Sequence, residues 1–197
     1  MPRETGRPLP RQTRSRERVE AVRTAALEVL RSEGLAGCTM AAVAARAGIT
    51  PTSLYRYFPN VEAVLQVVAE RQLDETHALI AQALTGLTSL EHARQTLVGL
   101  VGAYESIVRD DPARRALWSG GVTIEALNDL NIADSRRNGY LIAERISPFL
   151  ARPLDRERAF LVTHLVCLGT VLLIQVDDAE AAVLRPPLQA LVLTLLD

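Results

Sequence analysis

Apolar residues recur every three or four positions along most of the chain, which is the period of an amphipathic helix. Such stripes run through residues 15–33, 60–85 and 89–109. Gly34 stands where the first of these helices would end. No segment shows the strict alternation of apolar and polar residues that is typical of a half-buried β-strand. The pattern therefore predicts an all-α protein of about nine helices.

Two short helices are predicted between the first two long ones, in the sequence TMAAVAARAGITPTSLYRYFPN. Thr39 and Thr50 stand at helix N-cap positions, and Pro51 suits the first position of a helix, where its missing N–H costs nothing. Gly48 can adopt the left-handed conformation that ends a helix. A helix, a three-residue turn and a second helix form the helix-turn-helix arrangement.

Further helices follow to the C-terminus. Thr88 and Glu91 are spaced as a capping box that opens the helix over 89–109. A later helical region over 123–147 is either continuous or broken near Asp134. The adjacent prolines Pro186 and Pro187 predict that the last helical region is kinked or split in two.

Residues 159–176 carry no charged side chain, and this run is barely long enough to cross a membrane. It contains several polar residues, and no second such run accompanies it. We interpret it as a helix that is covered on one side by its own core and on the other by a partner subunit. The expected arrangement is a homodimer without membrane contact, with an interface of Leu165, Leu168, Leu172, Leu188, Leu191 and Leu195.

Charge is unevenly distributed along the chain. Residues 1–60 hold ten Arg and five Glu, a net charge of +5, whereas residues 61–197 have a net charge of −6. A basic N-terminal part on an acidic body predicts that only the first part meets a polyanion. Residues 1–14, which include four Arg and three Pro, are predicted to form a flexible basic arm. It either reaches an adjacent minor groove or adds only nonspecific attraction.

Other classes of function find little support. The sequence has no nucleophile elbow, phosphate loop or dinucleotide fingerprint, and its three His have no metal-ligand spacing. We therefore predict no enzyme, no metal and no cofactor. Two cysteines cannot form a disulfide framework, and the N-terminus lacks the apolar core of a secretory signal, so we expect a cytoplasmic protein. Cys38 precedes a helix cap that could acidify its thiol, although an inert thiol is the simpler interpretation.

The residues of the second short helix divide into two faces. Ile49 and Leu54 are expected to pack inward, which leaves Thr52, Ser53, Arg56 and Tyr57 facing outward. Exposed hydroxyls and guanidinium groups can reach base edges, while phenols and helix N-termini can bind phosphates. Combined with the basic arm, this favours double-stranded DNA as the partner over an ordinary helical hairpin.

The stretch TMAAVAARAGITPTSLYRYFPNVEAVL resembles the DNA-binding signature of the TetR family of bacterial transcriptional regulators. The resemblance is strong over residues 16–68, and the remainder matches the family only in helix number and length. It implies a helix-turn-helix domain over 15–59 and a ligand-binding and dimerisation domain over 60–197. It also implies that a small-molecule effector changes the spacing of the two DNA readers in a dimer.

The resemblance implies roles for individual residues. Thr39 matches a phosphate-contacting helix cap, and the start of the recognition helix matches at Thr50, Pro51, Thr52 and Ser53. Tyr55 and Tyr57 match aromatic positions that usually contact the DNA backbone, and Arg56 occupies a variable position that we expect to touch a guanine or a phosphate. Val61 departs from the pattern, because the family commonly has a phosphate-binding lysine there. Asn60 and the Arg-rich arm are the two candidates to offset that loss.

An effector site is expected among the C-terminal helices, mostly apolar with a few polar groups. Polar or aromatic residues on inward stripes are the candidates, although each one alone could equally be a core residue. They are His77, Tyr104, Trp118, Asn138, His164 and Cys167. No inward cluster of Arg is apparent, and Arg136 and Arg137 belong to a polar helix face, so the sequence favours an apolar or amphipathic effector.

The sequence therefore predicts a ligand-responsive DNA-binding regulator, a repressor that a small molecule releases from a palindromic operator. A helical carrier of hydrophobic ligands with a vestigial DNA-binding domain is the alternative from another class. A corepressor-dependent regulator or an activator of the same fold also remains open.

Overall fold

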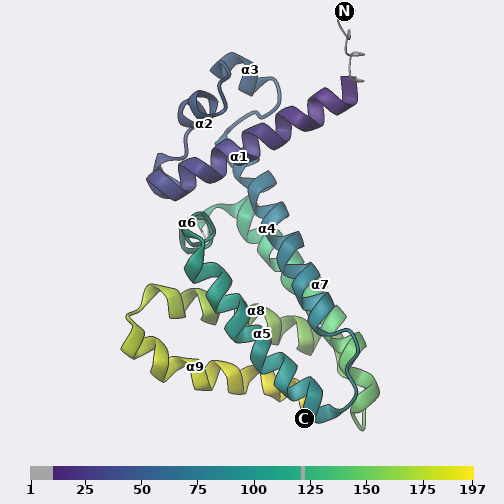
Figure 1. The fold of residues 1–197 in the computed structure, drawn as a ribbon. Coiled ribbons are helices and arrows are strands. Elements are labelled where there is room, and N and C mark those ends of the chain that lie inside the picture. Colours follow the sequence, from purple (N-terminus) through teal and green to yellow (C-terminus); the bar gives the residue numbers. More distant parts are fainter. Residues whose placement is uncertain (1–10, 121–122) are drawn as a thin grey trace, which may run out of the picture.

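The computed structural model describes residues 11–120 and 123–197, and all regular secondary structure in these ranges is helical (Figure 1). Residues 1–10 of the predicted arm lie outside the described residues, and helix α1 (Arg11–Gly37) begins four residues before the expected position. The helix is interrupted at Gly34, where the sequence predicts its end, because φ there is +70°. Only glycine adopts that conformation without strain.

Helix α2 (Met40–Arg46) packs against α1 at one end of the molecule and α3 (Pro51–Tyr55) packs against α2, and we call α2, α3 and the turn between them the reader. The turn contains Gly48, with φ of +66°, as predicted. Because a left-handed residue reverses the chain within three positions, the two short helices can cross and pack against each other.

Six longer elements build the rest of the fold. Helix α4 leads away from the reader, α6 lies next to α1 at the reader end, and α5, α7, α8 and α9 extend from there to form the helical body (Figure 1). Their bounds are α4 Val61–Ala83, α5 Leu90–Asp110, α6 Pro112–Gly120, α7 Glu125–Ile146, α8 Arg156–Gln175 and α9 Asp178–Leu193. Short 3₁₀ turns follow α7 (η2, Ser147–Phe149) and α9 (η3, Thr194–Leu196).

The structure corrects one local expectation, at Thr88, and narrows the alternatives left open at Asp134 and at Pro186–Pro187. Ser89, not Thr88, caps α5, and its hydroxyl accepts the His92 N–H at 3.0 Å. Helix α7 is continuous through Asp134, because its polar residues find partners within the fold. Helix α9 is not split at Pro186 and Pro187. Residues 182 and 183, whose carbonyls these prolines leave without an amide partner, are exposed, so water can satisfy those carbonyls.

The buried apolar residues form two clusters. The first joins the reader and α1 to the start of α4, and it also takes in Ala113, Leu117 and Trp118 of α6. The second lies among α5, α7, α8 and α9. Helix α4 and helix α6 therefore connect the reader to the helical body.

An apolar face remains uncovered on α8. Leu161, Leu165, Leu168 and Leu172 are 38–56% exposed, and their spacing of four, three and four places them on one side of the helix. By length and composition alone, α8 and the helical segment Asp178–Leu196 could each cross a membrane. Helix α8 also contains the polar residues Thr163 and Thr170. Its apolar surface is therefore a stripe of exposed leucines and does not extend around the whole helix.

Candidate functional sites

The reader separates one buried side from one exposed side, as the sequence predicts. Leu54 is fully buried and Ile49 is half-buried against the first core cluster. The residues around them are exposed, except Ser53, which is half-buried. The exposed candidates are Thr39, Thr50, Pro51, Thr52, Tyr55, Arg56, Tyr57 and Asn60. The reader therefore presents hydroxyls, phenols and one guanidinium group on a surface that no other part of the described chain covers.

Three of these candidates also cap helices. The hydroxyl oxygen of Thr39 accepts the N–H of Ala42 at 3.2 Å, and that of Thr50 accepts the N–H of Ser53 at 3.2 Å. Asn60 caps α4 by accepting the Ala63 N–H at 2.9 Å. In each threonine the O–H proton is still free to donate. A capping threonine can thus hold a helix N-terminus and an anion together.

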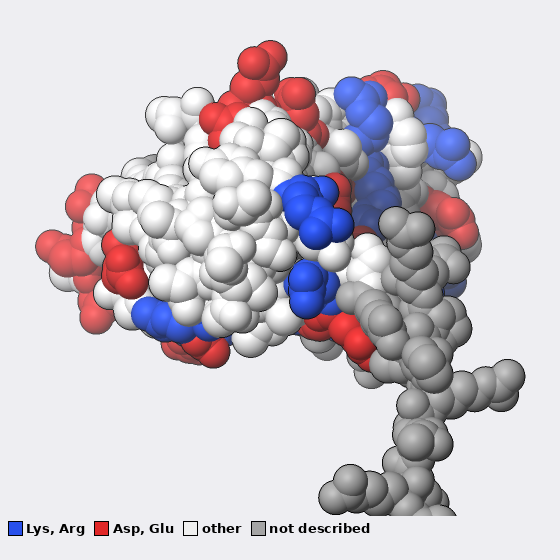
Figure 2. All heavy atoms as spheres, turned by 90° about the horizontal axis from the view of Figure 1, so that it is seen from above, with Lys and Arg blue, Asp and Glu red and all other residues white. Residues whose placement is uncertain are grey.

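Arginines near the reader have different partners. Arg46 lies 3.5 Å from Glu28 and 3.6 Å from Glu33 of α1, so its charge is partly offset. No ion pair to Arg56 occurs within the described ranges, and Arg56 borders a surface groove with Tyr57 and Arg18. Seen from above, the surface over α2 and α3 is largely uncharged, with basic side chains along one side (Figure 2).

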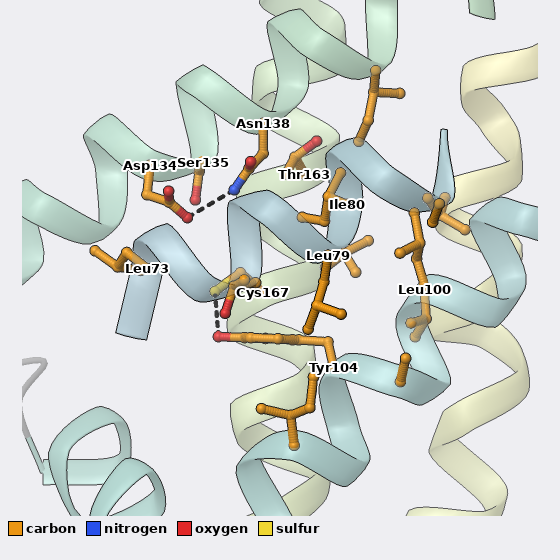
Figure 3. A pocket seen from close by; sticks show the side chains of 18 of the residues that line it. Leu73, Leu79, Ile80, Leu100, Tyr104, Asp134, Ser135, Asn138, Thr163 and Cys167 are labelled. Atoms are coloured by element: carbon orange, nitrogen blue, oxygen red, sulfur yellow. Dashed lines mark hydrogen bonds between the residues drawn. The ribbon is translucent and has the colours of Figure 1, made fainter. Parts of the chain in front are cut away.

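A cavity of about 240 Å³ lies among the C-terminal helices and α4. Apolar side chains of α4 and α5 form one part of its wall, among them Leu79, Ile80 and Leu100 (Figure 3). Asp134, Ser135 and Asn138 lie together at another part, next to Thr163 of α8 (Figure 3). The cavity is therefore amphipathic.

Its polar side is one face of α7. Asn131, Asp134, Ser135 and Asn138 are spaced at i, i+3, i+4 and i+7, so all four lie on a single helical face. Asn131, Ser135 and Asn138 are buried. We call these four residues the α7 stripe. The sequence predicts an inward Asn138 but assigns Arg136 and Arg137 of the same segment to a polar helix face. Packing of α7 against α4 and α8 shows that Asn131, Asp134 and Ser135 line the cavity as well.

Four of the six predicted effector residues line the cavity, namely Tyr104, Trp118, Asn138 and Cys167. The two histidines do not reach its surface. His77 Nδ1 lies 2.6 Å from Asn138 Oδ1, and His164 Nδ1 lies 3.1 Å from Ser135 Oγ. Both histidines therefore contact the α7 stripe from outside the cavity. The structure does not support direct contact of His77 or His164 with an effector in this cavity.

Arg114 of α6 also lines the cavity, and no pattern in the sequence predicts that this arginine points inward. It is only 5% exposed. Its guanidinium donates to the Gln72 carbonyl at 3.1 Å and to Thr76 Oγ1 at 3.0 Å, and it lies 3.3 Å from Glu75. A single buried cation with a nearby carboxylate is not the arginine cluster that would demand an anionic ligand, so the expectation of no inward cluster is unchanged.

Burial alters the acid–base behaviour of the cavity wall. It raises the pKa of the Tyr104 phenol and of the Cys167 thiol, whose Oη and Sγ atoms lie 3.4 Å apart. It lowers the pKa of His164. These three groups are therefore uncharged near neutral pH. Burial also raises the pKa of Asp134, although a hydrogen bond from Arg137 at 2.7 Å opposes that effect.

Cys38 is inert for the same reason. Its side chain is buried, and burial raises the pKa of the thiol to about 11. An acidified, redox-active Cys38 is thus contradicted by the structure. No three His, Cys, Asp or Glu side chains gather into a possible metal site in the part of the chain that the structure describes.

The predicted interface residues fall into three groups. Leu165, Leu168 and Leu172 of α8 are exposed, and Leu188 and Leu191 of α9 are half-buried. Leu195 is completely buried in the second core cluster of its own protomer, because η3 folds back onto the body. The prediction that Leu195 contacts a partner subunit is therefore wrong.

Comparison with known proteins gives two family matches. Residues 22–68 match the model of bacterial regulatory proteins of the tetR family, and residues 91–184 match a tetracyclin repressor-like C-terminal domain. No curated protein sequence matches the chain. The two matched ranges correspond to the part that holds the reader and to the part that holds most of the cavity wall.

Solved structures with similar folds cover nearly the whole chain. The fatty acid degradation regulator FadR from Bacillus halodurans superposes with a TM-score of 0.66 at 16% identity, over 89% of this chain and 94% of that one. FadR from Bacillus subtilis in complex with stearoyl-CoA gives 0.65 at 14% identity, over 90% and 97%. RolR in complex with resorcinol gives 0.63 at 18% identity, over 92% and 96%. At such identities the similarity concerns the fold.

Proposed function

Because the chain belongs to the TetR family of bacterial regulatory proteins, we propose that this transcriptional regulator is a cytoplasmic repressor, which a small apolar or amphipathic molecule releases from a palindromic operator. The observation behind the DNA-binding part is the division of α3. Leu54 is buried completely while Thr52, Tyr55 and Arg56 are exposed. A five-residue helix with one buried leucine has no structural need for that exposed set, whereas a DNA groove does.

In this proposal the reader contacts both the phosphate backbone and the base edges of the duplex. The capping hydroxyls of Thr39 and Thr50, together with Tyr55 and Tyr57, bind phosphates, and Arg56 touches a base edge or a phosphate. Pro51, Thr52 and Ser53 at the start of α3 enter the major groove, and Asn60 at the start of α4 borders the backbone. Phosphate contacts set position, and base contacts set sequence preference.

Two readers act together in a homodimer. The exposed leucine face of α8, extended by Leu188 and Leu191 of α9, supplies an apolar surface that suits an isologous interface. In the proposed dimer the two α3 helices lie about 34–36 Å apart, one turn of DNA, as two readers on adjacent half-sites require. A carrier of hydrophobic ligands would have no use for such a spacing.

The cavity and the reader are mechanically connected. Helix α4 has 23 residues, which corresponds to about 34 Å. Val64, Leu65 and Val68 at its start belong to the reader's core cluster, and Thr76 and Ile80 nearer its end line the cavity. An effector that tilts the cavity end of α4 therefore changes the position of the reader. A coupling free energy of about 1–3 kcal/mol is sufficient for release.

The fold is compatible with ligands of different kinds. Two structures of similar fold are complexes, one with stearoyl-CoA and one with resorcinol, so this architecture can hold a small molecule. In this chain the amphipathic cavity wall supports the choice of an apolar or amphipathic effector.

A selection of genomic fragments by the purified protein tests the proposal. We expect enrichment of a palindrome, with affinity that falls steeply as salt rises. Arg56→Ala should weaken binding to that palindrome, while Arg152→Ala, the same charge change in the exposed loop between η2 and α8, should not. Failure to enrich any duplex at low salt would favour the ligand carrier. If the effector instead tightens binding, the protein is corepressor-dependent.

A further inference from the structure

The cavity wall contains hydrogen-bonding groups without a partner. Thr163 Oγ1 and Arg114 Nε are shielded from solvent, and neither has a hydrogen-bond partner among the described residues. Both residues line the cavity, from α8 and from α6 respectively. A buried polar group without a partner costs stability, so each is a place where a ligand atom can add a missing hydrogen bond.

The charges of the wall are already balanced. Arg114 lies 3.3 Å from Glu75, and Asp134 accepts a hydrogen bond from Arg137 at 2.7 Å. Tyr104 and Cys167 contribute only protonated, neutral groups. A charged ligand head would lose its hydration without meeting an unpaired counterion, and an anionic head would also face Asp134. The wall thus favours an uncharged head.

The volume limits the size of the ligand. A cavity of about 150 Å³ holds one benzene molecule, so about 240 Å³ corresponds to roughly ten non-hydrogen atoms. The apolar side chains of Leu79, Ile80 and Leu100 lie opposite the polar group formed by Thr163 and the α7 stripe (Figure 3). A short apolar body with a polar end matches this arrangement.

We propose that the cavity binds an uncharged amphipathic molecule of about ten non-hydrogen atoms, whose oxygen-bearing head lies against Thr163 and the α7 stripe. An alcohol or ketone oxygen there accepts the Thr163 hydroxyl proton, and the apolar body packs on α4 and α5. This inference names the chemistry of the effector and rests on the proposed function.

Three probes of equal chain length test the head. Octan-1-ol, octanoate and octylammonium at pH 7 each have eight carbon atoms in a straight chain and differ in the charge of the head. Trp118, the only tryptophan of the chain, lines the cavity, so its fluorescence reports binding directly. We expect octan-1-ol to bind at least about tenfold tighter than either ion, as one desolvated, unpaired charge would cost. Equal or tighter binding of octanoate would overturn the proposal, as would the absence of binding by octan-1-ol.

A matched pair of variants tests the anchor. Thr163→Val keeps the shape and removes the unpaired hydroxyl, whereas Thr170→Val makes the same change on α8 at a residue that does not line the cavity and that donates to the Val166 carbonyl at 2.9 Å. Thr163→Val should raise the melting temperature of the free protein and weaken octan-1-ol binding by about five- to tenfold. Thr170→Val should leave the affinity unchanged. Equal affinities in both variants would contradict the anchor.

The proposed function is assessed separately, by operator binding without a ligand. If the protein binds its operator and octan-1-ol does not bind, only the ligand chemistry is wrong. If octan-1-ol binds with the expected preference and the protein binds no DNA duplex, the proposed role as a repressor is wrong and the proposed ligand chemistry stands.

Discussion

The two ends of the molecule treat polar side chains in opposite ways. Among the described residues, every buried polar or charged side chain lies at or beyond Gln72, and the core behind the reader is apolar throughout. The reader places its polar groups outside, where they cap helices and face solvent. The helical body places them inside, where they pair with each other. A rigid apolar core suits a surface of fixed shape, whereas a polar interior can be repacked by a ligand that replaces its internal hydrogen bonds.

The largest expected effect concerns the outer surface of the helical body. Its exposed leucines are apolar like the core behind the reader, although they face outward. Leu172→Arg places a charge within the proposed interface and should weaken the dimer by about 3 kcal/mol or more, over a hundredfold in dissociation constant. Sedimentation equilibrium measures this. Leu90→Arg, at another exposed leucine, is the control and should remain dimeric. A dimeric Leu172→Arg protein would show that the interface lies elsewhere.

The apolar core of the reader should be intolerant of truncation. Leu54 is fully buried, so Leu54→Ala removes its contacts and leaves a void, at a cost of about 2–4 kcal/mol. Urea unfolding followed by circular dichroism measures the loss. Leu90→Ala, with a side chain that is 38% exposed, should change stability by less than about 0.5 kcal/mol. Equal costs at the two positions would mean that α3 is not docked as described.

In the exposed polar residues of the reader, the contribution to DNA affinity and the contribution to helix capping should be separable by mutation. Thr39→Ala should cost about 1 kcal/mol of stability through the lost cap and about tenfold in operator affinity. Thr39→Asp retains a capping oxygen but brings a negative charge to the phosphates. We expect it to be as stable as the native protein and to bind the operator less well than Thr39→Ala. Comparison of melting curves with fluorescence anisotropy on operator DNA separates the roles, and unchanged DNA affinity in Thr39→Asp would place Thr39 away from the backbone.

The same difference between the two ends explains what the sequence could predict. The reader is encoded by neighbours in the chain. Thr39, Thr50 and Asn60 cap their helices, Pro51 opens α3, and Gly48 has a positive φ, all as expected from local rules. Such signals act within four residues, so one sequence is enough to read them.

The cavity depends on contacts between residues far apart in the chain. The inward direction of the α7 stripe is set by α4 and α8, about 60 residues before it and 30 after it, as the His77–Asn138 and Ser135–His164 contacts show. Arg114 was missed because a lone arginine on a short helix gives no periodic signal. The burial of Leu195 was missed because a final turn of 3₁₀ helix, which folds the chain back, has no distinct pattern.

A buried charge that does not line the cavity gives the most subtle test. Glu105 of α5 accepts two hydrogen bonds from Arg185 of α9, at 2.7 and 2.8 Å, and one from Arg109 at 3.0 Å. The Arg185 hydrogen bonds, opposed by burial and assisted by Arg109, lower the pKa of Glu105. Because the folded-state pKa is depressed, this stabilisation is present above the unfolded value of about 4.3 and is lost as pH falls through the folded value.

Glu105→Gln should therefore be less stable than the native protein by about 1 kcal/mol at pH 7, and the difference should shrink as the solution is acidified below about pH 4. Urea unfolding at a series of pH values measures it, with Glu91→Gln at an exposed position as the control. The reader's core has no buried carboxylate, so Leu54→Ala should lower the free energy of unfolding by the same amount at pH 7 and at pH 3. A deficit for Glu105→Gln that stays constant down to pH 3 would mean that Glu105 acts by shape and not by charge, and the contrast between an apolar reader core and an ionic body would lose this support.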